Sequence, residues 1–136
     1  MSETRPPFVY TVRVGYADTD KMGFAHHSRF VVYLESARIE LLRSLGESYK
    51  EWEDRGILLP VTEISINYAK PAYFDDVLGI SVRIGELSRI RLKFDYEVRC
   101  EARGLTLATG TTSHVFMNGE GKPMRVAEDI LAKLRS

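Results

Sequence analysis

The most regular pattern in the sequence is an alternation of apolar and charged residues over positions 90–101. About a dozen residues of period two predict an antiparallel strand with one face against a core and the other in water. Shorter alternations of the same kind predict further strands. These lie at residues 9–16, 64–68, 78–85 and 105–117.

A helical period replaces the alternation over residues 28–45. The apolar positions cover much more than one stripe of the helix, so we expect this long helix to be covered on most sides. Gly46 follows as the predicted C-cap. Residues 47–56 are polar and predict a second short helix or a loop, and the tail predicts a short terminal helix. The face of the long helix is formed by Phe30, Leu34, Ala37, Leu41 and Leu45.

This order of elements predicts an α+β fold. One strand, one long helix and then consecutive strands with short connections favour an antiparallel sheet over βαβ units. We expect a curved sheet of about five strands wrapped around one long central helix. The length suits a single domain over residues 1–136, with residues 1–8 as a flexible lead-in. The partly apolar outer face of the sheet suggests pairing with another subunit.

Composition narrows the classes of partner. The 19 basic and 19 acidic side chains balance, which removes the general electrostatic argument for binding nucleic acid or an anionic membrane. The N-terminus has no signal-peptide pattern, and no apolar stretch approaches the roughly 20 residues that span a bilayer. The lone Cys100 cannot form an internal disulfide. We therefore expect a cytoplasmic protein that binds neither nucleic acid nor membrane.

The densest group of reactive side chains lies between the first strand and the long helix. It consists of Tyr16, Asp18, Asp20, His26 and His27. A helix N-terminus offers free backbone N–H groups, which stabilise negative charge on a carbonyl oxygen during acyl transfer. A carboxylate just upstream can attack the same carbonyl or activate water. The segment therefore forms a workable acyl-transfer site, although acidic turns before helices are also common as caps.

Three separated stretches resemble the 4-hydroxybenzoyl-CoA thioesterase-type hotdog proteins. The first contains YADTDKMGFAHH at residues 16–27 and ESAR at residues 35–38. The second is YAKPAYFDDVL at residues 68–78, and the third is GTTSHVFMNGEGKP at residues 110–123. Together the resemblance covers about residues 9–126. Three stretches in the same order are more specific than one short motif.

The resemblance implies a hotdog fold and an acyl-CoA thioesterase with its active site at a subunit interface. It places Asp20 on the catalytic carboxylate and the backbone N–H of His27 on the thioester carbonyl. Tyr16 and His27 also match the Tyr and His used by the Tol–Pal cluster branch, whereas His26 departs from the aromatic residue usual there. The implied protein needs no metal or redox cofactor and forms a homodimer or homotetramer.

Substrate contacts are predicted around the same segment. Gly23, Phe24 and Phe30, with Met22, are candidates to bind the acyl group, whose identity the sequence does not reveal. The phosphates of CoA need cations. Arg89 and Arg91 lie beside the strand that CoA follows in the resembled family, although both also fit the wet face of a strand. Further candidate cations are Lys70, Arg83 and Lys93.

Other readings of these residues compete with the catalytic one. Asp18 fits a turn or cap, Tyr16 fits the core face of its strand, and His26 fits a structural role. His114, in the middle of a strand, is interpreted as a hydrogen-bonded structural histidine. A metal site built from the two Asp and two His residues lacks a further ligand cluster.

Other functions compete with hydrolysis as well. A hotdog module that binds acyl-CoA or acyl carrier protein without cleaving it is the main alternative, and it has no need of the Asp20 carboxylate. Phosphotransfer built on Asp18-Thr-Asp20 would require a parallel sheet. A hotdog dehydratase would place Asp and His about five residues apart, whereas Asp20 and His27 are seven apart.

Overall fold

The computed structural model describes residues 7–135. Residues 1–6 of the predicted lead-in lie outside this range, and the first strand already begins at Phe8. The strands are β1 (Phe8–Arg13), β2 (Val61–Tyr68), β3 (Val77–Leu87), β4 (Arg91–Cys100) and β5 (Leu105–Val115). The helices are α1 (His27–Ser44), α2 (Tyr49–Asp54) and α3 (Glu128–Arg135), with short 3₁₀ turns η1 (Tyr16–Asp18) and η2 (Glu101–Arg103).

The five strands form one antiparallel sheet in the order β1-β3-β4-β5-β2. Tight connections join β3 to β4 and β4 to β5. By contrast, β2 and β3 are consecutive in the chain but are separated in the sheet by β4 and β5. The two edge strands are therefore β1, which precedes α1, and β2, which follows α2. The prediction of a five-stranded antiparallel sheet is confirmed.

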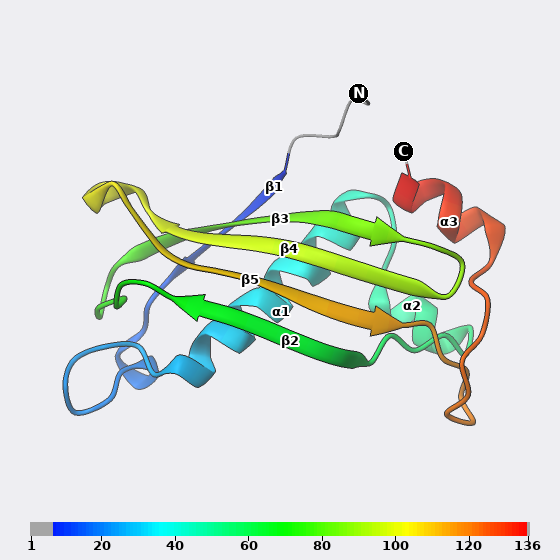
Figure 1. The fold of residues 1–136 in the computed structure, drawn as a ribbon, viewed down its shortest axis with the longest axis horizontal. Helices are drawn as coiled ribbons and strands as arrows, with labels where there is room; N and C mark the ends of the chain where they lie inside the picture. The colour runs from blue at the N-terminus through cyan, green and yellow to red at the C-terminus, as the bar shows by residue number, and fades with distance from the viewer. Residues whose placement is uncertain (1–6, 136) are drawn as a thin grey trace.

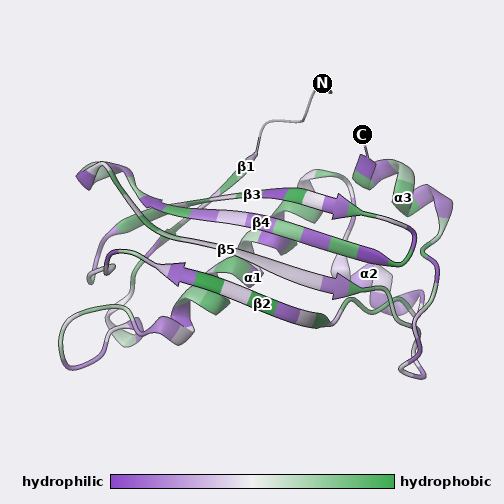
Figure 2. Cartoon of the chain, viewed as in Figure 1, coloured by the Kyte–Doolittle hydropathy of each residue, from purple (hydrophilic) through white to green (hydrophobic). Residues whose placement is uncertain are grey.

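Helix α1 lies along one face of the sheet, and α2 and α3 lie together at one end of the molecule (Figure 1). The strict alternation of β4 is confirmed, because each of its apolar residues is buried and each charged residue is at least partly exposed. Figure 2 shows the same alternation along the ribbon of β4. The core lies between the sheet and the apolar side of α1.

The described chain has three helices, so the expectation of one long helix was incomplete. Residues 47–56, expected as a short helix or a loop, contain the helix α2, and the predicted terminal helix is present as α3. Gly46 ends α1 with a φ of 86°, and the N–H of Glu47 donates to the carbonyl of Leu42. The predicted glycine cap is therefore confirmed. None of the helices within residues 7–135 is long and apolar enough to span a membrane.

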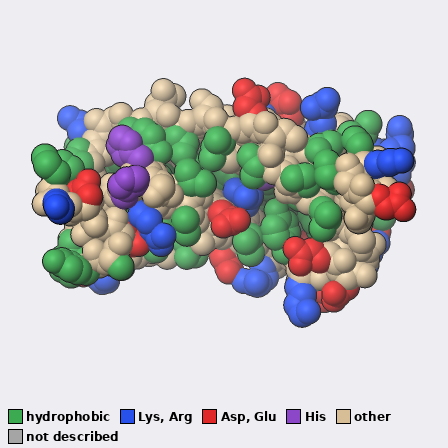
Figure 3. Space-filling model, turned by 90° about the horizontal axis from the view of Figure 1, so that it is seen from below, with side chains coloured by type: hydrophobic (Ala, Val, Ile, Leu, Met, Phe, Trp, Pro, Cys, Tyr) green, Lys and Arg blue, Asp and Glu red, His purple; other side chains and the backbone are tan. Residues whose placement is uncertain are grey.

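Edge strand β2 differs from the other strands in its burial. All of its residues except Ile66 are exposed in the single chain, although three of them are large and apolar. These are Val61, Ile64 and Tyr68, with exposed fractions of 44%, 43% and 38%. Hydrophobic side chains are spread over the face of the molecule that holds β2 and α1 (Figure 3).

A buried polar network links α1 to the sheet. The buried Arg38 guanidinium, on α1, lies near Tyr96, whose hydroxyl lies 2.6 Å from Thr112 Oγ1. The same oxygen lies 2.8 Å from His114 Nε2, and His114 Nδ1 lies 3.3 Å from the carbonyl of Leu59. His114 is thus a buried, hydrogen-bonded residue, as the sequence predicts.

Acidification is expected to destabilise the fold through His114. Burial, with a contribution from the Arg38 charge, lowers the pKa of His114 from 6.5 to about 4. Because the unfolded chain binds this proton more readily, the free energy of unfolding falls as the pH drops from 6.5 to 4. The loss from this residue is about 3 kcal/mol. Urea unfolding at pH 7 and pH 4.5 measures it, and His114→Gln should show a weaker pH dependence. Equal dependence in both proteins would contradict the account.

Candidate functional site

The loop between β1 and α1 leaves the sheet immediately after Arg13. The N–H of Val14 donates to the carbonyl of Asp76 at 2.8 Å, and the chain then turns through η1. The sequence-based strand over residues 9–16 is therefore too long. Tyr16 lies on η1 with 78% of its surface exposed, so its interpretation as a core residue was wrong.

Asp18 holds this loop to α1. Its carboxylate accepts hydrogen bonds from the N–H of Gly15 and the hydroxyl of Tyr33, each at 2.9 Å. Arg29 Nε pairs with the same carboxylate at 2.8 Å. Burial raises the pKa of Asp18, but these bonds and the Arg29 charge outweigh it, so the pKa lies below its ordinary value. The turn role expected for Asp18 agrees with this geometry.

Removing the Asp18 carboxylate is expected to loosen the loop. Asp18→Ala leaves the Tyr33 hydroxyl and the Arg29 guanidinium without their acceptor, at a cost of about 2 kcal/mol in the free energy of unfolding. Urea unfolding at pH 7 measures the change. Asp129→Ala is the matched control, because it removes an exposed ion pair with Arg55 and should change stability little. Equal effects of the two substitutions would show that Asp18 does not anchor the loop.

Asp20 lies at the start of a tight turn that returns the chain toward α1. Asp20 Oδ1 accepts from the N–H of Met22 at 2.8 Å and of Phe24 at 3.3 Å. Gly23, at a φ of 87°, closes the turn by donating its N–H to the Asp20 carbonyl. Within residues 7–135, Asp20 Oδ2 receives no hydrogen bond. One carboxylate oxygen is therefore fixed by the loop, and the other is available to a ligand.

The N-terminus of α1 follows four residues after Gly23. His26 is its N-cap, since His26 Nδ1 accepts from the N–H of Ser28 at 3.2 Å. The N–H of Arg29 donates to the His26 carbonyl. The N–H of His27 has no acceptor among the described residues, so the first turn leaves this donor for a ligand. The structural role expected for His26 agrees with the cap.

Asp20 and the first turn of α1 border one hollow with a volume of about 590 Å³. The lining is mainly apolar and aromatic on the side of α1 and β2. Histidine side chains are visible at one end of the face seen in Figure 3. Of the predicted site residues, the hollow brings together Asp20, Phe24, His27 and Phe30, and of the candidate cations for CoA it includes Lys70. The rest of the lining is Ala25, His26, Tyr68, Ala69 and Pro71.

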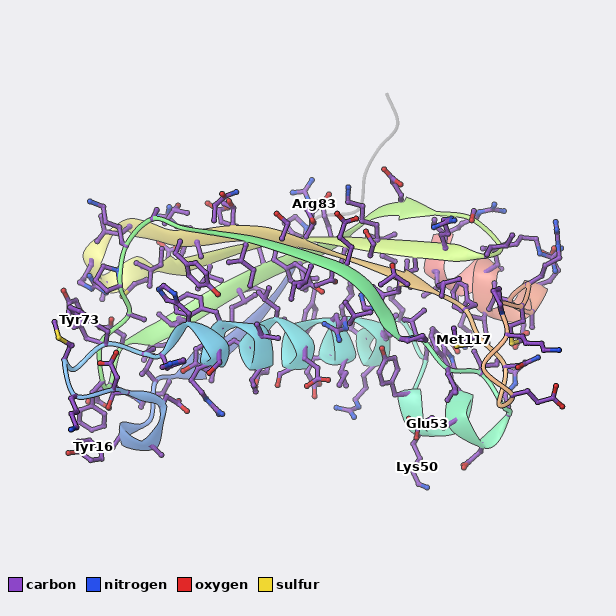
Figure 4. The ribbon with its side chains drawn as sticks, turned by 60° about the horizontal axis from the view of Figure 1, so that its bottom comes forward. Tyr16, Lys50, Glu53, Tyr73, Arg83 and Met117 are labelled. Atoms are coloured by element: carbon purple, nitrogen blue, oxygen red, sulfur yellow. The ribbon has the colours of Figure 1, made fainter. Side chains whose placement is uncertain are left out.

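Other predicted site residues lie outside this lining. Tyr16 makes an edge-to-face contact with Phe74, at 5.6 Å between ring centroids, and it lies at the same end of the molecule as Tyr73 (Figure 4). Arg89 pairs with Glu128 at 2.8 Å and donates to the Val126 carbonyl.

Arg91 borders a second hollow of about 310 Å³. The strand ends that line it are Thr62 and Glu63 of β2, together with residues of β3, β4 and β5. A single chain therefore does not bring either Arg89 or Arg91 to Asp20.

The sequence gives no role to Tyr68, which the structure brings into the hollow. Its hydroxyl donates to the carbonyl of His27 at 3.1 Å, and its ring stacks on the His27 ring at 3.9 Å between centroids. The second stretch that resembles the family begins at Tyr68, and this was the feature of the sequence that could have indicated a role for it. Within residues 7–135, no three His, Cys, Asp or Glu side chains gather in a group that could hold a metal ion.

Comparisons with known proteins agree on one family. The family model described as the Thioesterase-like superfamily matches residues 14–134. The acyl-CoA thioesterase YbgC of Haemophilus influenzae is 29% identical over 126 residues, covering 92% of each chain.

Solved structures give the same result. A Thermus thermophilus protein superposes with a TM-score of 0.88 at 40% identity, covering 93% of this chain and 96% of that one. A 1,4-dihydroxy-2-naphthoyl-CoA thioesterase from Synechocystis has a TM-score of 0.88 at 27% identity, covering 95% and 96%.

Proposed function

The chain belongs to the Thioesterase-like superfamily, and from this premise we propose that it hydrolyses an acyl-CoA thioester to the free acid and CoA. Relatives named as acyl-CoA thioesterases and as 1,4-dihydroxy-2-naphthoyl-CoA hydrolases support a thioester hydrolase. They favour an enzyme over the alternative of a module that only binds acyl-CoA or acyl carrier protein. The acyl group stays open, because the relatives' names cover more than one.

One observation carries the proposal. Asp20, with one carboxylate oxygen free of the loop, and His27, with an unpaired N–H, line the same hollow at the N-terminus of an 18-residue helix. A thioester carbonyl between them would direct its oxygen to the N–H and its carbon to the carboxylate. The N–H and the helix dipole would then stabilise the negative charge that develops on the oxygen.

Asp20 has two routes to the same products. As a nucleophile, Asp20 Oδ2 attacks the carbonyl carbon, the CoA thiolate leaves, and water hydrolyses the resulting anhydride. As a general base, Asp20 takes a proton from water, the hydroxide attacks the carbonyl carbon, and the thiolate leaves. The free Oδ2 supports both routes. The fixed Oδ1 keeps the carboxylate aimed in either case.

Further roles in the proposal follow the sequence predictions. The rings of Phe24 and Phe30 line the hollow and would contact the acyl group, and Gly23 shapes the turn beside it. The His27 ring would help to orient the thioester. Tyr16 would reach the substrate only in the assembled protein, since in the single chain it lies outside the hollow.

We propose that the site is completed by a second copy of the chain joined along β2. The exposed edge of β2 carries unpaired backbone groups and the apolar Val61 and Ile64, which favour strand pairing. In an antiparallel pair about a two-fold axis, the Val61 end of one β2 meets the Tyr68 end of the other. The partner's second hollow, which includes Arg91, would then approach the first. In this arrangement Arg91 would contact the CoA phosphates. Arg89 is less suited to this role, because it is paired with Glu128.

A thiol-release assay tests the proposed function. The wild-type protein is given short-chain, long-chain and aromatic acyl-CoAs, and CoA and free acid are both quantified. We expect equal amounts of the two products from at least one substrate. Tight binding of acyl-CoA without release from any of them would contradict hydrolysis and support the binding module. A cytoplasmic location and a dimer or tetramer stay predictions.

A further inference from the structure

Tyr68 makes three separate contacts with the first turn of α1. It is the last residue of β2, and its hydroxyl donates to the His27 carbonyl at 3.1 Å. Its ring lies nearly parallel to the His27 ring, at 10°, with 3.9 Å between centroids. It also meets the ring of buried Phe30 edge-on, at 84° and 5.3 Å. One side chain of the edge strand therefore touches both the backbone and the ring of His27.

The His27 ring depends on this stack for its orientation. Neither ring nitrogen of His27 has a hydrogen-bond partner within residues 7–135, whereas His26 next to it is fixed through Nδ1. In a histidine that is fixed by hydrogen bonds, at least one ring nitrogen is already occupied by such a bond. A histidine fixed by stacking keeps both nitrogens available to the thioester or to water. Tyr68 thus fixes the ring without blocking it.

The hydrogen bond acts on the backbone in the same way. The His27 carbonyl belongs to the peptide unit that directly follows the His27 N–H, so the bond from Tyr68 restrains the backbone next to this donor in the first turn of α1. The Tyr68 phenol is a donor at neutral pH, because the ordinary pKa of tyrosine already lies far above 7 and burial raises the pKa of Tyr68 further. A misplacement of about 1 Å at such a donor lowers turnover strongly.

We propose that Tyr68 is a positioning residue, which holds the ring and the N–H of His27 toward the thioester carbonyl. The inference rests on the proposed hydrolysis and deepens it. Because Tyr68 ends the strand whose free edge would pair with the partner, it also connects the subunit interface to the carbonyl site. A purely structural Tyr68 would only cover Phe30, and its loss would lower stability without changing kcat in the surviving folded protein.

Two substitutions separate the contacts. Tyr68→Phe keeps the stack and removes the hydrogen bond, so kcat should fall about fivefold. Tyr68→Leu removes both, so kcat should fall about 50-fold. In each case KM should stay within about twofold, because the carbonyl oxygen is held most strongly in the transition state. Asn67→Ala is the matched control, since its side chain lies on the opposite face of β2 and outside the hollow.

A spectroscopic readout accompanies the kinetics. The Tyr68 ring should shift the NMR signals of the His27 ring protons upfield in the wild type and in Tyr68→Phe, and the shift should disappear in Tyr68→Leu. Unchanged His27 signals in Tyr68→Leu, or an unchanged kcat, would overturn the positioning role. These outcomes differ from failure of the proposed function, in which the wild-type protein itself releases no CoA from any acyl-CoA.

Discussion

Asp20→Asn is expected to lower kcat for acyl-CoA hydrolysis by about 10³-fold while the protein stays folded. The amide has nearly the size of the carboxylate, and its oxygen can still accept from the N–H groups of Met22 and Phe24, so the turn keeps its shape. It can neither attack the carbonyl nor take a proton from water. Steady-state thiol release and thermal unfolding, measured side by side, check both parts of the prediction.

A matched control is Asp54→Asn, which changes an exposed carboxylate at the end of α2 and should leave kcat unchanged. The Asp20→Asn protein should still bind acyl-CoA with an affinity near that of the wild type. If it retained more than about a tenth of the wild-type kcat, Asp20 would be neither nucleophile nor general base.

Ile64→Lys is expected to dissociate the protein into monomers of 15.5 kDa and to reduce turnover with them. The charge would be buried without a partner in the middle of the β2 edge, raising the dimer Kd by about 10²-fold or more. Turnover should fall because each site would lose the partner's contribution. Light scattering coupled to size exclusion measures the mass, and thiol release at the same protein concentration measures activity.

Val9→Lys is the control for this substitution, because Val9 is an exposed apolar residue on the other edge strand, β1, with 54% of its surface exposed against 43% for Ile64. It should leave both mass and turnover unchanged. A wild-type protein that is already monomeric and fully active would contradict the shared site. So would Ile64→Lys protein that dissociates without losing activity.

The sequence predicts the local elements of this fold well. The period-two pattern of β4, a helix close to residues 28–45 and the glycine cap at Gly46 depend on neighbours in the chain, and the structure has all three. The expectation that this helix is covered on most sides is wrong for the single chain, in which Val31 and Val32 are 41% and 38% exposed. The position of β2 depends on pairing with β5, whose partner residues lie 40 to 53 positions further along the chain. An edge strand and a central strand have similar patterns, so the exposure of Ile64 was not predictable from alternation.

The residues of the candidate site also fall into two groups, those that are close in the sequence and those that only the fold brings together. Asp20 and His27 lie seven residues apart, so a turn before a helix is enough to bring them to one hollow. Tyr68 is 41 residues from His27 and joins them only because β2 ends beside α1. Tyr16 was expected in a strand, but the Asp18 side chain caps a 3₁₀ turn there and exposes the ring. The hydrogen bond of the Asp18 side chain therefore determines the backbone here, and the alternating pattern of residues 9–16 does not.

The most direct test of the site is a crystal structure of the Asp20→Asn protein with an intact acyl-CoA. We expect the thioester oxygen to lie about 2.7–3.1 Å from the backbone nitrogen of His27. The residue 20 side chain should face the carbonyl carbon from the other side. A thioester bound elsewhere, with the N–H of His27 still without an acceptor, would contradict a carbonyl site at the N-terminus of α1.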